Sequence, residues 1–168
     1  MLDLDKNPFK ELFDKLGEDG IQKLFSKFNG TYHSHRDFVA VYHPDWSYKP
    51  ELLEEEGNNF REWMYLYYDD TDQEAMVNFI KEWKALYESK GIESGYTVYT
   101  AGFGHYGPGM VIHTWGKTRA DHARIEGENE TKLGEDAHKL WERTSTIVTR
   151  QEVKSGYLME DISYIPQQ

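Results

Sequence analysis

The chain has 168 residues, a formal net charge of −11 and no cysteine. A chain of this length can form one domain with a real core, so we expect a single domain over residues 1–168. The negative charge disfavours nucleic acid and anionic membranes as partners, and the absence of cysteine excludes disulfides, thiolate nucleophiles, zinc-thiolate sites and iron–sulfur clusters.

The first fifty residues predict a helix followed by a strand. The opening "MLDLDKNPFKELFDKLG" is amphipathic and acidic, unlike a signal peptide, and no apolar run reaches membrane-spanning length, so we expect a cytoplasmic protein. Asn7 and Pro8 suit the N-cap and first turn of a helix that breaks at Gly17 and continues to Phe28. A strand is expected at residues 37–43.

The middle of the chain predicts a strand, a helix and two further strands. Strands are expected at 62–68, 95–102 and 109–117, with a helix over 71–91 that starts at a Thr71–Glu74 capping box and stops at Gly91. "GFGHYGPG", residues 102–109, matches the spacing of a dinucleotide-binding loop. Because a strand and not a helix follows it, we interpret it as a hairpin loop.

The last third predicts a helix over 118–150, interrupted near Gly127 and resuming at Leu133, and a strand over 155–165. The element order from residue 61 to 166 is therefore β-α-β-β-α-β. The predicted fold class is α+β, a ferredoxin-like unit with a four-stranded antiparallel sheet and both helices on one face. It follows an N-terminal helix-strand extension within residues 1–50.

The extension resembles the C-terminal helix-strand. "LGEDGIQKLF" from Leu16 parallels "LGEDAHKLW" from Leu133, and "DWSYKP" from Asp45 parallels "DISYIP" from Asp161. Two matches in register favour a partial internal repeat, and the alternative is coincidence between two amphipathic helices.

The strand order, the aromatic strands and the "LGED…LW…R…DISYIP" ending resemble the dimeric α+β barrel superfamily over about two thirds of the chain. The superfamily includes cofactor-free and haem-degrading monooxygenases, among them enzymes of antibiotic biosynthesis, small isomerases and proteins without known activity. The resemblance implies a homodimer in which two sheets pack face to face. It does not fix a function.

Alternation along the strands predicts two different sheet faces. One face is aliphatic and should lie beneath the helices: Met64, Leu66, Val98, Met110, Ile112, Leu158 and Ile162. We call the other the aromatic face: Trp63, Tyr65, Tyr67, Tyr99, Val111, His113, Trp115, Tyr157 and Asp161. A second copy of the chain would bury this face.

Two interpretations of the aromatic face stay open. In the first it forms a pocket for a small apolar or aromatic molecule, with His113 and Trp115 as candidate catalytic residues of a cofactor-free, monooxygenase-like enzyme. Trp63, Tyr65, Tyr67, Tyr99 and Tyr157 would then be the ligand-binding residues. In the second, the face is only the interface of a non-enzymatic homodimeric scaffold.

We expect no cofactor and no metal. In haem-degrading members of the superfamily, a tryptophan on the third strand, a histidine on the second helix and an asparagine on the first strand form the site. Trp115 and His138 lie on comparable elements, but the first strand lacks the asparagine, which leaves haem the less favoured alternative. His33, His35 and His43 have no acidic third ligand at a defined spacing and are typical of a polar loop.

Overall fold

The structure is a computed structural model, and it describes residues 10–34 and 36–159. The chain divides into two compact units, residues 1–36 and 37–168, which are described separately. In the first unit, helix α1 spans Lys10–Ser26 and is broken at Gly17, whose φ of 62° and ψ of 175° are non-helical. The break was predicted, whereas the expected cap at Asn7 and Pro8 lies outside the described residues.

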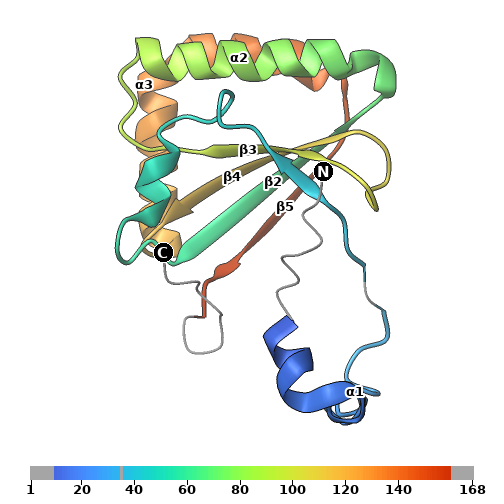
Figure 1. Cartoon of the computed structure of the whole chain (residues 1–168). Helices are drawn as coiled ribbons and strands as arrows, with labels where there is room; N and C mark the ends of the chain where they lie inside the picture. Colours follow the sequence, from blue (N-terminus) through green and yellow to red (C-terminus); the bar gives the residue numbers. More distant parts are fainter. Residues whose placement is uncertain (1–9, 35, 160–168) are drawn as a thin grey trace. The chain divides into compact units, whose positions relative to one another are not determined.

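The second unit is an open five-stranded antiparallel sheet with two long helices (Figure 1). Its strands are β1 (Ala40–Tyr42), β2 (Phe60–Tyr68), β3 (Thr97–Ala101), β4 (Gly109–Gly116) and β5 (Val148–Tyr157), in the order β1-β3-β4-β2-β5. Helices α2 (Gln73–Ser89) and α3 (Arg119–Ser145) pack on one face, and short 3-10 helices η1 (Pro50–Glu54) and η2 (Asp70–Asp72) lie in the connections. The fold is therefore α+β.

The core lies between the sheet and the two helices. It joins side chains of the sheet to those of α2 and α3: Leu66, Val98, Met110, Ile112, Met76, Phe79, Ile80, Leu133 and Leu140. The strand residues in this set are those that alternation predicted for the aliphatic face. Leu158 is half-buried, and Ile162 lies outside the described residues.

For helix α2, the predicted C-terminal boundary is correct and the predicted N-terminal boundary is wrong. Thr71 lies inside η2 and not at an N-cap, and α2 begins after Asp72 without a side-chain cap, so the predicted capping box is absent. The C-terminal stop is confirmed, because Gly91 has a φ of 60°. The amides of Gly91 and Ile92 donate to the carbonyls of Glu88 and Tyr87 at 3.2 and 3.1 Å, which is a Schellman motif.

Two predictions for the C-terminal third are wrong. Helix α3 is broken at Gly134 and not near Gly127, because a glycine inside a helix lowers its stability by only about 1 kcal/mol and does not by itself end it. The helix ends at Ser145, and strand β5 begins at Val148, seven residues earlier than the predicted start at residue 155. Strand β5 is an edge strand with many polar residues, so alternation does not mark it.

The proposed repeat has a local counterpart in the backbone. Gly17 in "LGED" of α1 and Gly134 in "LGED" of α3 both break their helices with positive φ, 62° and 56°. Asp161–Pro166, the predicted counterpart of Asp45–Pro50, lies outside the described residues. None of the helices within residues 10–34 and 36–159 is long and apolar enough to cross a membrane.

Candidate functional site

Strand register places the predicted residues of β2, β3 and β4 on one face of the sheet, opposite the helix-facing core. Trp63 pairs with His113, Tyr65 with Val111, and Arg61 with Trp115 across β2 and β4. Tyr99 of β3 also pairs with Val111, and Tyr67 follows Tyr65 by two residues on β2. Paired residues in an antiparallel sheet share a face, so these side chains lie together.

Tyr157 is not part of this group, and its predicted position on the aromatic face is wrong. It pairs with Phe60, whose side chain faces the helices, and the two rings lie 5.3 Å apart. Its hydroxyl accepts a hydrogen bond from the Arg119 amide at the start of α3, at 3.1 Å. Asp161 lies outside the described residues, so "aromatic face" below means Trp63, Tyr65, Tyr67, Tyr99, Val111, His113 and Trp115.

His113 is at the centre of the aromatic face. Its side chain is 5% exposed, and its ring stacks on Trp63 with centroids 4.9 Å apart and an interplanar angle of 7°. Trp115 packs against the same imidazole at a tilt, with a centroid distance of 5.7 Å. The three rings form a compact aromatic group on two neighbouring strands.

The two imidazole nitrogens of His113 differ. Nδ1 lies 3.1 Å from Thr97 Oγ1, whereas Nε2 is buried and has no hydrogen-bond partner among the residues that the structure describes. Burial, assisted by the nearby Arg61 guanidinium, lowers the pKa of His113 to about 4. The ring is therefore neutral at pH 7, and its Nε2 is a buried polar atom whose hydrogen-bonding capacity is not satisfied by the described residues.

Positively charged side chains border the aromatic face along β2 and β5. Lys154 pairs with Trp63 across the strands, and its Nζ lies 4.8 Å from the centroid of the Tyr65 ring. The Arg150 guanidinium lies 3.9 Å from the Tyr67 centroid and forms an ion pair of 3.0 Å with Glu152. These cations cover aromatic rings from the edge of the sheet.

The hairpin loop between β3 and β4 covers one end of the aromatic face. The two strands are antiparallel, which confirms that "GFGHYGPG" connects a hairpin. His105 from this loop stacks on Tyr67 with centroids 5.1 Å apart, and Phe38 packs edge-on against both His105 and Tyr65. This end is therefore closed by the chain itself, while Trp63 remains half-buried.

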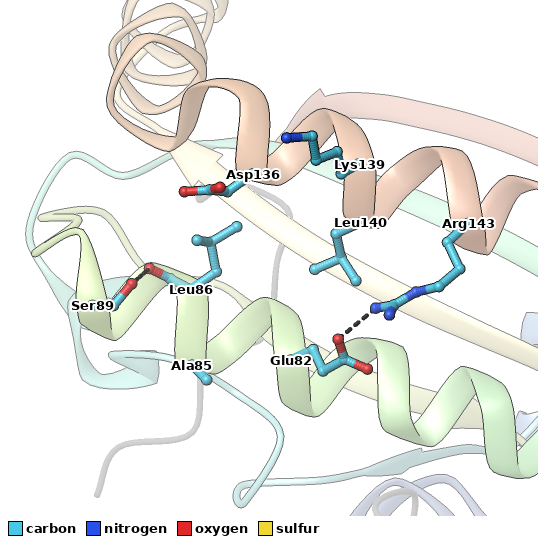
Figure 2. A pocket seen from close by; sticks show the side chains of 8 residues that line it. All are labelled: Glu82, Ala85, Leu86, Ser89, Asp136, Lys139, Leu140 and Arg143. Atoms are coloured by element: carbon cyan, nitrogen blue, oxygen red, sulfur yellow. Dashed lines mark hydrogen bonds and ion pairs between the residues drawn. The ribbon is translucent and has the colours of Figure 1, made fainter.

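Two hollows of the second unit include neither Trp63 nor His113. A groove of about 480 Å³ runs between α2 and α3 on the outer side of the helices. Figure 2 shows its lining side chains: Glu82, Ala85, Leu86 and Ser89 from α2, and Asp136, Lys139, Leu140 and Arg143 from α3. Ion pairs Arg143–Glu82 and Lys90–Asp136 join the two helices across it, so its charges already have partners.

A cleft of about 330 Å³ reaches Trp115 from the side of α3. Arg124, its central cation, pairs with both Asp121 at 2.8 Å and Glu128 at 2.7 Å. Because these charges neutralise one another, the cleft offers no clear preference for a ligand.

The remaining histidines are separated from the aromatic face. His138 is exposed on the second half of α3, whereas Trp115 is buried beside His113 on the aromatic face. His43 stacks on Trp46 and contacts Thr100 Oγ1 at 2.8 Å. Within the described part of the chain, no group of three or more histidine or acidic residues is arranged to hold a metal ion.

Two residues of the site were missed at the level of sequence, Arg61 and Thr97. Each has the same parity as the aromatic residues on its strand, so the alternation that selected Trp63 and Tyr99 would also have selected them. Lys154 could not be found in this way, because β5 was predicted to begin after it.

No family model, no curated protein and no solved structure matches this chain.

Proposed function

We propose that this protein binds a small, flat, largely apolar molecule on the aromatic face, beside His113. The observation that carries the proposal is the buried Nε2 of His113, which has no hydrogen-bond partner among the described residues. Leaving such an atom unpaired costs about 1–3 kcal/mol. A ligand that displaces the side chains covering Nε2, hydrogen-bonds this atom and packs on the Trp63–His113 stack would remove that cost.

The low pKa of His113 favours binding over base catalysis. An imidazole whose conjugate acid has a pKa of about 4 is a weak base at pH 7. A general base is most effective when its pKa lies near the working pH. We therefore assign His113 chiefly to ligand recognition, and a cofactor-free oxidation that uses His113 and Trp115 is the less favoured form of the proposal.

We further propose that the second unit is ferredoxin-like and forms a homodimer of the α+β barrel type. Strands β2 to β5 occur in the order β5-β2-β4-β3, which supports the ferredoxin-like assignment. Half-buried Trp63, Tyr65 and Tyr67 give the sheet an apolar surface that a second copy could cover. In this arrangement the sheet of the second copy would cover the ligand site on the aromatic face.

The test combines native mass spectrometry with thermal unfolding in 2-naphthol, a flat aromatic molecule with one hydroxyl. The parent should be a dimer of twice the 19.8 kDa chain mass and should be stabilised by about 2.7 kcal/mol at a hundred times the dissociation constant. His113→Phe should abolish this stabilisation, and Tyr157→Phe, on the other face, should retain it. A dimer that retains no small molecule and is stabilised by neither 2-naphthol nor related compounds would support the scaffold interpretation instead.

A further inference from the structure

Two cations on the aromatic side of the sheet have no ion-pair partner among the described residues. Arg61 is half-buried, its Nη1 donates to the Asn58 carbonyl, and the Glu54 carboxylate acts on its charge from beyond ion-pair distance. Lys154 contacts the Tyr65 ring but no carboxylate. By contrast, Arg150 on the same side pairs with Glu152.

The charge on the aromatic side of the sheet is opposite in sign to the net charge of the whole chain. The sequence contains 30 acidic and 19 basic side chains. On the aromatic side of β2 and β5, however, alternation places Arg61, Arg150 and Lys154 with only one carboxylate, Glu152. Positively charged side chains therefore border the aromatic face of a protein that is otherwise anionic. The electrostatic potential of the cations without ion-pair partners would attract an anion to this face.

Space is available next to Arg61. Its partner on β5 is Gly156, and a Cβ added there would meet no heavy atom within 4 Å. Trp115 lies on the opposite side of Arg61, across β4. Arg61 therefore lies on β2 between Trp115 of β4 and a glycine of the edge strand that leaves open space beside it.

We infer that the ligand is a flat aromatic anion, such as an aromatic carboxylate. Its ring would pack against the group formed by Trp63, His113 and Trp115, and its negative charge would bind Arg61, while Lys154, above the Tyr65 ring further along β2, would add to the positive potential. The inference rests on the proposed function and adds the charge of the ligand to it. A guanidinium binds a carboxylate through paired, charge-assisted hydrogen bonds, which are about twice as strong as neutral ones.

The test compares two probes of the same shape, 2-naphthoate and the neutral 2-naphthamide, by isothermal titration calorimetry at low ionic strength. The parent should bind 2-naphthoate at least about tenfold more tightly than 2-naphthamide, which corresponds to one charge-assisted contact. Added salt should reduce the difference.

Four single variants test where the charge of the ligand lies. Arg61→Gln and Lys154→Gln should each reduce the preference for 2-naphthoate. If the change at the half-buried Arg61 impairs folding, Lys154→Gln, at an exposed position, still tests the inference. Lys81→Gln, the same change of charge at an exposed position of α2, should keep the preference. Gly156→Val, which fills the notch beside Arg61, should weaken 2-naphthoate more than 2-naphthamide.

The outcomes separate the inference from the proposed function. Equal affinities for the two probes, or a preference that persists in the Arg61→Gln, Lys154→Gln double variant, would overturn the inference and leave the binding site in place. Weakened dimerisation of that double variant, without any probe preference in the parent, would mean that the cations pair with a carboxylate of a second copy. Binding of neither probe would overturn both.

Discussion

Acidification should destabilise the parent protein more than a His113→Phe variant. The imidazole is neutral in the folded protein because burial lowers its pKa from 6.5 to about 4. In the unfolded chain it takes up a proton below pH 6.5. The unfolded state thus binds more protons between these two values, so the contribution of His113 to stability falls as the pH falls.

The size of the effect follows from the difference between the two pKa values. Each unit corresponds to about 1.4 kcal/mol, so a shift from 6.5 to about 4 is equivalent to about 3 kcal/mol. The full contribution is present above pH 6.5 and is lost as the pH approaches 4. Phenylalanine is similar in size to histidine and does not titrate, so the other ionisable groups cancel when the variant is compared with the parent.

Urea unfolding of both proteins at several pH values from 7 to 4 measures this effect. The free energy of unfolding of the parent, minus that of His113→Phe, should decrease by about 3 kcal/mol over the series. A difference that stays constant with pH would show that the imidazole is hydrated or paired in the folded state. His113 would then carry no unsatisfied buried nitrogen for a ligand to bind.

Three further results are expected. Gly91→Ala should lower the free energy of unfolding by about 1 kcal/mol because of the positive φ at residue 91. Gly127→Ala, inside α3 with open space around it, should raise the free energy of unfolding by about 0.5–1 kcal/mol. Equal effects of the two variants in chemical denaturation would refute the assigned helix stop. Tyr157→Phe should change stability by less than about 1 kcal/mol because the side chain is 56% exposed, and should leave 2-naphthol binding intact; a loss of binding would return Tyr157 to the site. Trp63→Glu should convert the dimer to a monomer in light scattering, and a variant that stays dimeric would place the interface elsewhere.

Element types and face assignment could be predicted from the sequence wherever one side of an element is buried. The aliphatic residues of β2, β3 and β4 alternate because they pack beneath α2 and α3, and the same alternation selected the residues around His113. Gly91 was a reliable stop because the residues after it complete a Schellman motif.

The edge of the sheet could not be predicted in this way. Strand β5 has an exposed, charged sequence, so its limits depend on pairing with β2 and not on a hydrophobic pattern. This error placed Tyr157 on the wrong face and concealed Lys154. The stack of His113 on Trp63, the unpartnered Nε2 and the unpaired charge of Arg61 depend on register and distance, which composition and alternation do not contain.

The most direct test of the site is a titration of the protein with 2-naphthoate followed through the side-chain nitrogens of its histidines by NMR. The account predicts that Nε2 of His113 shows the largest change in chemical shift, while the nitrogens of His122, which is buried on the helix side and contacts Thr114, stay nearly unchanged. A saturable change confined to other histidines, or no change at His113 while the probe binds, would contradict the assignment of the aromatic face as the ligand site.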